Sequence, residues 1–160
     1  MRAAAKISDC GRYRYSLERE WSKAPPMVFC MLNPSTADAS VDDPTIRRCI
    51  GFAKREGCGG IYVVNLFAYR ATNPADLRSA GDPFGPENAE EIGAAMTWAA
   101  VGGPFVAAWG ANPAARHGRA YITERARAFG IKVYCLGKTK AGAPMHPLYL
   151  PGNADLQVYP

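Results

Sequence analysis

Three polar residues lie where short apolar runs of the sequence end, and their side chains are suited to recognition and proton chemistry. Asn33 follows the apolar residues 27–32, and Asn65 lies within the apolar run 61–67. His146 starts a His-Pro pair after a loop rich in glycine and lysine. A carboxamide can orient a water molecule or bind a nucleobase edge bidentately, and an imidazole can stabilise a developing anion.

Each of these residues also has a purely structural interpretation, which the sequence leaves open. Asn33 can bond its own backbone in a simple turn before Pro34. Asn65 can be satisfied by neighbouring backbone in the core, since a buried amide without any partner costs about 1–3 kcal/mol. His146 can be an ordinary surface residue in a turn. His117 lies in a basic segment, where we expect a solvated surface residue.

Further candidates lie beside these three or at neighbouring strand ends. We expect a role in substrate binding for Pro34, Ser35, Phe67, Tyr69, Trp109, Lys138 and Lys140. The aromatic rings can stack on a base or belong to the core, and the lysines can hold phosphates. Asp38 is the one carboxylate placed to act as a base near Asn33.

Several common chemistries have no signature in this sequence. The sequence contains no phosphate-binding loop, no dinucleotide fingerprint, no H-E-x-x-H and no nucleophile elbow. Its two histidines exclude a multi-histidine metal site. Its five cysteines are odd in number and include no C-x-x-C pair, so a zinc site or a disulfide framework is not expected. We therefore expect neither a metal nor a cofactor.

Composition places the chain among globular proteins with a basic surface. The 160 residues are 48% hydrophobic and 21% charged, which suits one α/β domain over 1–160. The net charge of +5 favours an anionic partner such as nucleic acid, a nucleotide or a nucleoside, although an ordinary basic surface has the same charge. No apolar run approaches the ~18 residues of a membrane span, and the protein is expected to be cytoplasmic without a membrane partner.

The elements that must position the site follow from periodicity and from turn residues. Apolar runs predict strands over 27–32, 61–67, 104–110 and 131–136. Helical spacing predicts helices over 44–56, 88–100 and 114–129. Asp43 and Pro44 suit the start of the first helix, and Gly130 the end of the last.

The alternation of strands and helices predicts an α/β fold, a three-layer sandwich on a short four-stranded parallel sheet. In residues 12–19, tyrosine and leucine alternate with arginine and serine as in a half-buried strand, which we expect at an antiparallel edge. The tail 151–160 is expected on the surface. Because ligands bind beyond the carboxyl ends of parallel strands, we expect a site built from 33–38, 65–70, 109–112 and 137–149.

Two resemblances sharpen these expectations. The phrases RYRYSLEREW, MLNPSTADASVDDPTIRRCIGFAKREG, VVNLFAYRATNP and GKTKAGAPMHPLYL resemble a bacterial and phage family catalogued as a domain of unknown function, number 1643. The order of the motifs resembles, more remotely, the uracil-DNA glycosylase superfamily. The matching motifs are Leu32-Asn33-Pro34-Ser35, Val64-Asn65-Leu66, Val106-Ala-Ala-Trp109-Gly110 and His146-Pro147-Leu148.

The remote resemblance implies a uracil-DNA-glycosylase-like fold and a hydrolase that cleaves N-glycosidic bonds. It implies that Asn33 orients the attacking water, that Asn65 reads the base and that His146 faces the departing base. Two departures from the pattern motivate an alternative. Met31 and Leu32 stand where the superfamily has glycine, and Leu148, Tyr149 and Leu150 follow His-Pro. The alternative is a non-catalytic nucleic-acid or nucleotide-binding module on the same fold, and an unrelated reaction on this scaffold is a third possibility.

Overall fold

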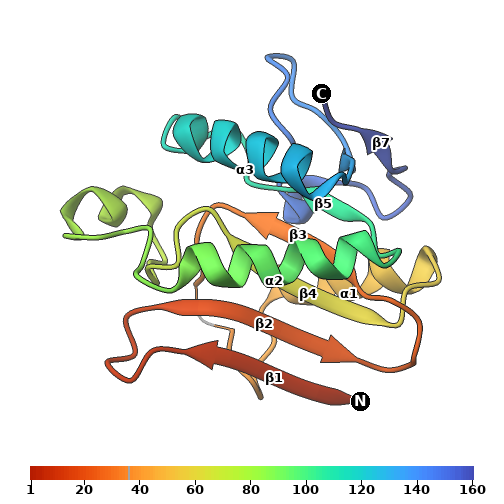
Figure 1. Cartoon of the computed structure of the whole chain (residues 1–160), viewed down its shortest axis with the longest axis horizontal. Coiled ribbons are helices and arrows are strands. Elements are labelled where there is room, and N and C mark those ends of the chain that lie inside the picture. Colours follow the sequence, from red (N-terminus) through yellow and green to blue (C-terminus); the bar gives the residue numbers. More distant parts are fainter. Residues whose placement is uncertain (36) are drawn as a thin grey trace.

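One mixed sheet forms the centre of the protein, in a computed structural model that describes residues 1–35 and 37–160. The strand order is β1-β2-β4-β3-β5-β6-β7 (Figure 1). The strands are β1 (Arg2–Ile7), β2 (Arg14–Glu20), β3 (Met27–Met31), β4 (Gly60–Asn65), β5 (Phe105–Ala107), β6 (Val133–Cys135) and β7 (Gln157–Val158). The four neighbours β4, β3, β5 and β6 run parallel, and the outer strands pair antiparallel.

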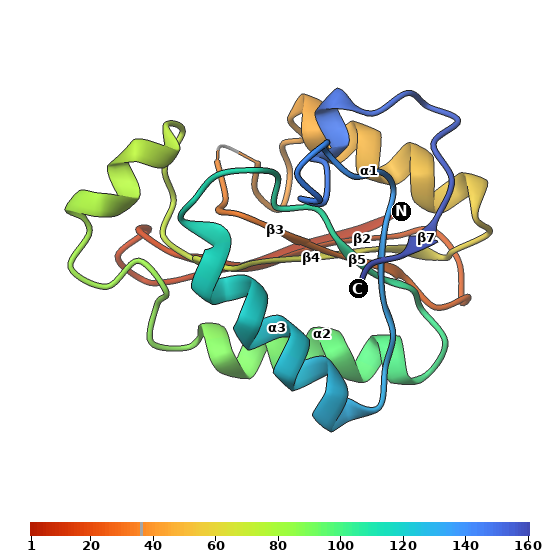
Figure 2. The same ribbon diagram turned by 90° about the horizontal axis from the view of Figure 1, so that it is seen from above.

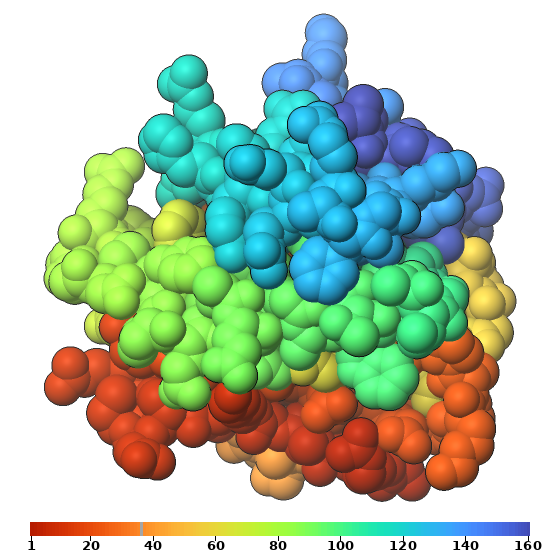
Figure 3. All heavy atoms as spheres, viewed as in Figure 1, coloured from red at the N-terminus to blue at the C-terminus, as the bar shows by residue number. Residues whose placement is uncertain are grey.

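Helices cover both faces of this sheet, as a three-layer sandwich requires. The helices are α1 (Pro44–Arg55), α2 (Asn88–Ala100) and α3 (Ala115–Phe129), with the 3-10 turns η1 (Pro74–Ser79) and η2 (Pro147–Tyr149). α1 and η2 pack on one face, and α2 and α3 pack on the other (Figure 2). Figure 3 shows the second face, where α2 and α3 cover the middle of the sheet. The predicted layers are confirmed, but the sheet in the described residues has seven strands instead of the expected four parallel strands with one edge strand.

The central strands form where the apolar runs predicted them. All residues of β3 and β4 are buried, because helices cover both sides of these strands. Within β4, Ile61 and Val63 point toward α1, whereas Tyr62 and Val64 point toward α2 and α3. This alternation decides the direction of the next residue, Asn65.

The helix boundaries also agree with their signals. Asp43 caps α1 by accepting a hydrogen bond from the Ile46 amide at 2.9 Å, and Pro44 is its first residue. α3 ends at Gly130, whose φ of 70° places it in the left-handed region that glycine tolerates.

The prediction of an antiparallel edge strand over residues 12–19 is wrong in its position. β2 is antiparallel to β4, but β1 pairs with its other side and is the true edge. The segment Arg2–Ile7 is rich in alanine, which has little strand preference, and so gave no signal. Because β2 is covered on both faces, Arg14, Ser16 and Arg19 are buried rather than on a solvated face.

The chain end also differs from the prediction. Gln157–Val158 pairs with β6 as β7, and Tyr159 is buried against the core instead of lying on the surface. β5 and β6 are shorter than their apolar runs. In residues 1–35 and 37–160, no helix has the length and apolar character needed to cross a membrane.

Candidate functional site

Asn65 is the last residue of β4 and lies beside Met31, the last residue of β3, in the parallel register. Its side chain shares the α1 face with Ile61 and Val63, because successive side chains alternate along the strand. Asn65 is 1% exposed, and neither its amide nitrogen nor its amide oxygen has a hydrogen-bond partner among the described residues. Buried polar groups are almost always bonded, so this carboxamide has unused recognition capacity.

Asn33 lies two residues beyond the end of β3, at the same edge of the sheet. Its Nδ2 donates to the Ala71 carbonyl oxygen at 2.6 Å and to the Pro34 carbonyl oxygen at 3.1 Å. These two bonds fix the plane of the carboxamide. Within the described part of the chain, its Oδ1 accepts no hydrogen bond, so this oxygen can accept one from a water molecule.

The residues after Asn33 are tied to the segment that follows β4. Pro34 is buried, and its carbonyl oxygen also accepts from the Ala71 amide at 3.1 Å. The Ser35 carbonyl oxygen accepts from Arg70 Nε at 3.5 Å. Thr36, which completes the motif in the sequence, lies outside the described residues. The two predicted segments 33–38 and 65–70 therefore meet at one place.

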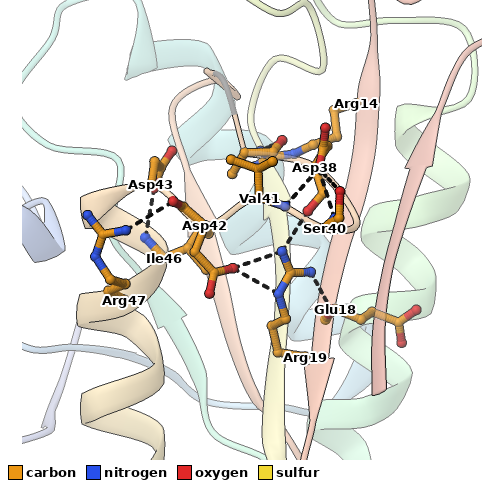
Figure 4. A network of polar contacts seen from close by, with 11 residues as sticks. Arg14, Glu18, Arg19, Asp38, Ser40, Val41, Asp42, Asp43, Ile46 and Arg47 are labelled. Atoms are coloured by element: carbon orange, nitrogen blue, oxygen red, sulfur yellow. Dashed lines mark hydrogen bonds and ion pairs between the residues drawn. The ribbon is translucent and has the colours of Figure 1, made fainter. Parts of the chain in front are cut away.

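Two buried arginines of β2 hold the loop that carries Asn33 (Figure 4). Arg14 donates from Nη1 to the Ala37 carbonyl oxygen at 2.9 Å, and its Nε is buried without a partner among the described residues. Arg19 donates to the Asp38 carbonyl oxygen at 2.6 Å and to the Asp42 carboxylate at 2.9 Å. Burial lowers the pKa of Arg14 to about 10, so it stays a cation at neutral pH.

Asp38, the carboxylate suggested as a base, has a structural role in its loop. Its Oδ1 accepts hydrogen bonds from the Ser40 amide at 2.8 Å, the Val41 amide at 2.9 Å and the Ser40 hydroxyl at 3.2 Å. These bonds stabilise the charged form and lower the pKa of Asp38. Through these hydrogen bonds, Asp38 shapes the loop.

His146 precedes η2 and caps it, because its Nδ1 accepts from the Leu148 amide at 3.2 Å. Burial lowers the pKa of His146, and the negative charge of Asp43 opposes this only in part. The ring is therefore neutral at physiological pH, and with Nδ1 accepting, its proton is on Nε2. A neutral imidazole in this state offers one N–H donor to an anion.

Asp43, at the start of α1, acts electrostatically on both His146 and Arg14. Its charge raises the pKa of both His146 and Arg14, against the stronger effect of burial. η2 packs on α1, and Asn65 faces the same side of the sheet. Asn33 and Asn65 thus lie at the carboxyl ends of neighbouring strands, and His146 precedes η2, which packs on α1; no hydrogen bond joins any two of the three among the described residues.

The predicted aromatic residues lie elsewhere. Phe67, Tyr69 and Trp109 pack against the core on the α2 and α3 side of the sheet. Trp109 is 3% exposed and meets Tyr159 edge to face, with ring centroids 5.8 Å apart. Tyr69 meets Tyr13 edge to face at 6.0 Å. The structure does not bring these rings to the face that carries Asn65.

Lys138 and Lys140 are exposed on a hairpin over residues 137–145. The hairpin is closed by hydrogen bonds from the Met145 amide to the Gly137 carbonyl oxygen at 2.9 Å and from the Thr139 amide to the Ala143 carbonyl oxygen at 2.8 Å. Neither lysine forms an ion pair with a described residue, so both charges face solvent.

Comparison with known proteins assigns the chain to a family. The family described as "Protein of unknown function (DUF1643)" matches residues 14–148. The chain belongs to this family. No curated protein matches it, and no solved structure matches it.

In this DUF1643 family member, the polar side chains at the carboxyl edge are of few chemical kinds. Among residues 1–35 and 37–160, no group of three histidine, cysteine or acidic side chains is placed to hold a metal ion. The side chains at the edge are amides, an imidazole and guanidinium groups, which bind bases and anions.

Sequence reasoning missed Arg14, Arg70 and Ala71 in this family member. Arg14 was assigned to an exposed face because arginine and serine alternate with tyrosine and leucine there, whereas its side chain bonds to the loop at Ala37. Arg70 and Ala71 lie in a polar connection without periodicity. Only the hydrogen bonds in the structure, from Arg70 to Ser35 and from Asn33 to Ala71, show that they hold the segment after β3.

Proposed function

We propose that this protein hydrolyses the N-glycosidic bond of a nucleobase, on a fold of the uracil-DNA glycosylase type. The observation that carries the proposal is Asn65, a buried carboxamide at the carboxyl end of a parallel strand with both amide atoms unpartnered among the described residues. An Asn side chain can donate to and accept from one base edge at once, which would satisfy both atoms.

Asn33 and His146 take the two other roles. Asn33 Oδ1 accepts a hydrogen bond from water, and its Nδ2 keeps the carboxamide fixed through Ala71. His146 donates from Nε2 to the base as the bond to the sugar breaks and negative charge develops on the base. The water oxygen bonds to the anomeric carbon, the electron pair of the C–N bond leaves with the base, and the proton released by the water ends on the base.

Base binding also requires movement at the edge, because both amide atoms of Asn65 are out of contact with solvent. The loop 33–43 is held by hydrogen bonds from Arg14 and Arg19 to two of its carbonyl oxygens. Such bonds can be exchanged for bonds to a ligand.

A binding module without turnover is the second candidate, and the state of Asp38 favours it. Its Oδ1 is engaged in hydrogen bonds from Ser40 and Val41 that hold the loop, which does not favour a role in proton abstraction. The two candidates predict the same ligand, and they differ in whether a free base is released.

Mass-spectrometric detection of free base distinguishes them. The substrates are single- and double-stranded DNA with uracil, deaminated or alkylated bases, and free nucleosides. We expect release by the wild type, loss of release in Asn33→Ala and normal release in the control Asn153→Ala, which changes an exposed asparagine. Binding of all substrates without release by the wild type would favour the module, and neither binding nor release would refute the proposal.

A further inference from the structure

A groove of about 720 Å³ runs along α3, between this helix and two loops. One wall is α3, and the other consists of residues 109–113 and 141–144, the second of which belongs to the hairpin 137–145. Tyr159 lies in its lining. Figure 3 shows the surface hollowed at the top of the view, between α3 and this hairpin.

The helix wall of the groove is positively charged. Arg116, Arg119 and Arg127 line it and are exposed, whereas Glu124 is the one acidic side chain among its described lining residues. None of the three arginines forms an ion pair with a described residue. The hairpin opposite carries Lys138 and Lys140, also exposed.

The spacing of the arginines fits an extended anion. Arg116 and Arg127 are separated by eleven positions on one helix, which is about 16 Å along the axis at a rise of 1.5 Å per residue. A site for one phosphate group needs cations that converge on one point, as a bidentate guanidinium does. Cations in a row along a groove are instead the arrangement that tracks a nucleic-acid backbone.

Two further observations concern the floor of the groove. The Arg119 guanidinium lies over the Tyr159 ring, 5.4 Å from its centroid, so this cation is held in place at the groove. The Tyr159 hydroxyl is buried without a partner among the described residues. A lining residue with an unused hydrogen-bond donor is what a bound polar ligand would satisfy.

The groove also leads to the candidate site. Gly110 lies in its lining, and a Cβ placed on Gly110 would be 3.9 Å from His146 Cβ. Within the wall that faces α3, the Pro144 carbonyl oxygen accepts from the Gly110 amide at 2.8 Å. The groove wall at Gly110 therefore lies next to the Cβ of His146, the residue assigned to the departing base.

We propose that this groove binds the phosphodiester backbone of a single-stranded nucleic acid and presents one of its bases to the edge that carries Asn65 and His146. The proposal rests on the proposed function for the role of that edge, whereas backbone binding stands on the groove alone. A concave groove with protein on both walls admits one strand, whereas a duplex is usually contacted by an element that enters its own grooves.

The salt dependence of binding tests the proposal. Fluorescence anisotropy gives the dissociation constants of labelled twelve-nucleotide oligothymidine and oligouridine between 50 and 200 mM salt, which also separates DNA from RNA. For single strands, the slope of log K against log salt is about −0.7 for each phosphate contact. We expect the double variant Arg116→Gln/Arg127→Gln to make this slope less steep by about 1.4, which corresponds to two lost phosphate contacts. Its loss of affinity between 50 and 200 mM salt should then be roughly sevenfold smaller than that of the wild type.

Two control variants test whether the change in slope comes from the charges in the groove. Lys23→Gln/Lys132→Gln removes the same charge from exposed positions at the opposite edge of the sheet, and its slope should equal that of the wild type. Arg116→Lys/Arg127→Lys keeps the charge and should restore the slope. An unchanged slope in the glutamine variant, binding that does not weaken with salt, or equal binding to a duplex of the same length would overturn the groove proposal.

The groove and the proposed reaction can fail separately. If the wild type releases base from free nucleosides while the glutamine variant binds oligonucleotides normally, the groove proposal is wrong and the reaction stands. If the slopes change as expected but neither oligonucleotides nor nucleosides lose a base, the groove stands as a binding site and the reaction is wrong.

Discussion

Arg14 donates a hydrogen bond from Nη1 to the Ala37 carbonyl oxygen at 2.9 Å, so a buried cation on β2 holds the loop that carries Asn33. This contact joins the antiparallel part of the sheet to the edge of its parallel part. The edge is therefore built from four parts of the chain that are distant in sequence: β2, the segment after β3, the segment after β4, and η2.

Removing this cation should loosen the loop and destabilise the fold. We expect Arg14→Ala to lower the free energy of unfolding by about 1.5–3 kcal/mol, the value of a hydrogen bond to a charged group. Urea denaturation measures the change. Arg12→Ala, at an exposed position two residues earlier, should stay within about 0.5 kcal/mol of the wild type. Equal effects of the two substitutions would show that the Ala37 contact contributes nothing.

Asn65 should be a position where stability and function conflict. Because its amide atoms are buried without partners among the described residues, Asn65→Leu should raise the free energy of unfolding by about 1–3 kcal/mol. The same substitution should abolish ligand binding. Denaturation and binding measured on one sample test both effects. A destabilised variant would indicate that the native carboxamide is bonded within the protein.

The fold was largely predictable because strong local signals produced its centre. β3 and β4 are uninterrupted apolar runs, and Asp43 with Pro44 marks the start of α1. The alanine-rich β1 and the two-residue β7 have no comparable pattern, since they depend on pairing with strands already in place. Hence the sheet was predicted without β1 and β7.

The candidate site was predictable only in part, for a similar reason. Asn33, Asn65 and His146 could be found because each interrupts or ends an apolar segment. The contact of Arg14 is with the loop at Ala37, and the bond from Asn33 to Ala71 depends on a connection without periodicity. Whether the Asn65 carboxamide has a hydrogen-bond partner depends on residues that are close in space but distant in sequence. Local sequence patterns do not identify these residues.

His146 should make the protein less stable in mild acid. Burial lowers the pKa of its imidazole in the folded state, so the unfolded state binds the proton more readily. Stability is then complete above the unfolded pKa of about 6.5 and falls as pH decreases through that value toward the folded pKa. Urea midpoints between pH 5 and 8 should show this loss, and His146→Gln should reduce it. A variant with the same pH profile as the wild type would contradict the assignment.

The substitution Asp38→Asn distinguishes a structural role of the Asp38 carboxylate from a catalytic one. Hydrogen bonds from Ser40 and Val41 lower the pKa of Asp38 in the folded state, so its stabilising effect is present above about pH 4 and is lost as pH falls through the folded pKa. Asparagine keeps an acceptor for both amides but loses the charge. We expect Asp38→Asn to retain base release and to lose less stability in acid than the wild type. Loss of base release in a folded variant would return Asp38 to the role of general base.

The central claim, hydrolysis of an N-glycosidic bond by a water that Asn33 orients, is tested most directly by running the reaction in isotopically labelled water. The substrate is the one from which base release is greatest, and both products are weighed by mass spectrometry. The account predicts one labelled oxygen on the sugar, none on the base, and no products with Asn33→Ala. Label on the base, or wild-type protein that binds every substrate and releases nothing, would contradict it.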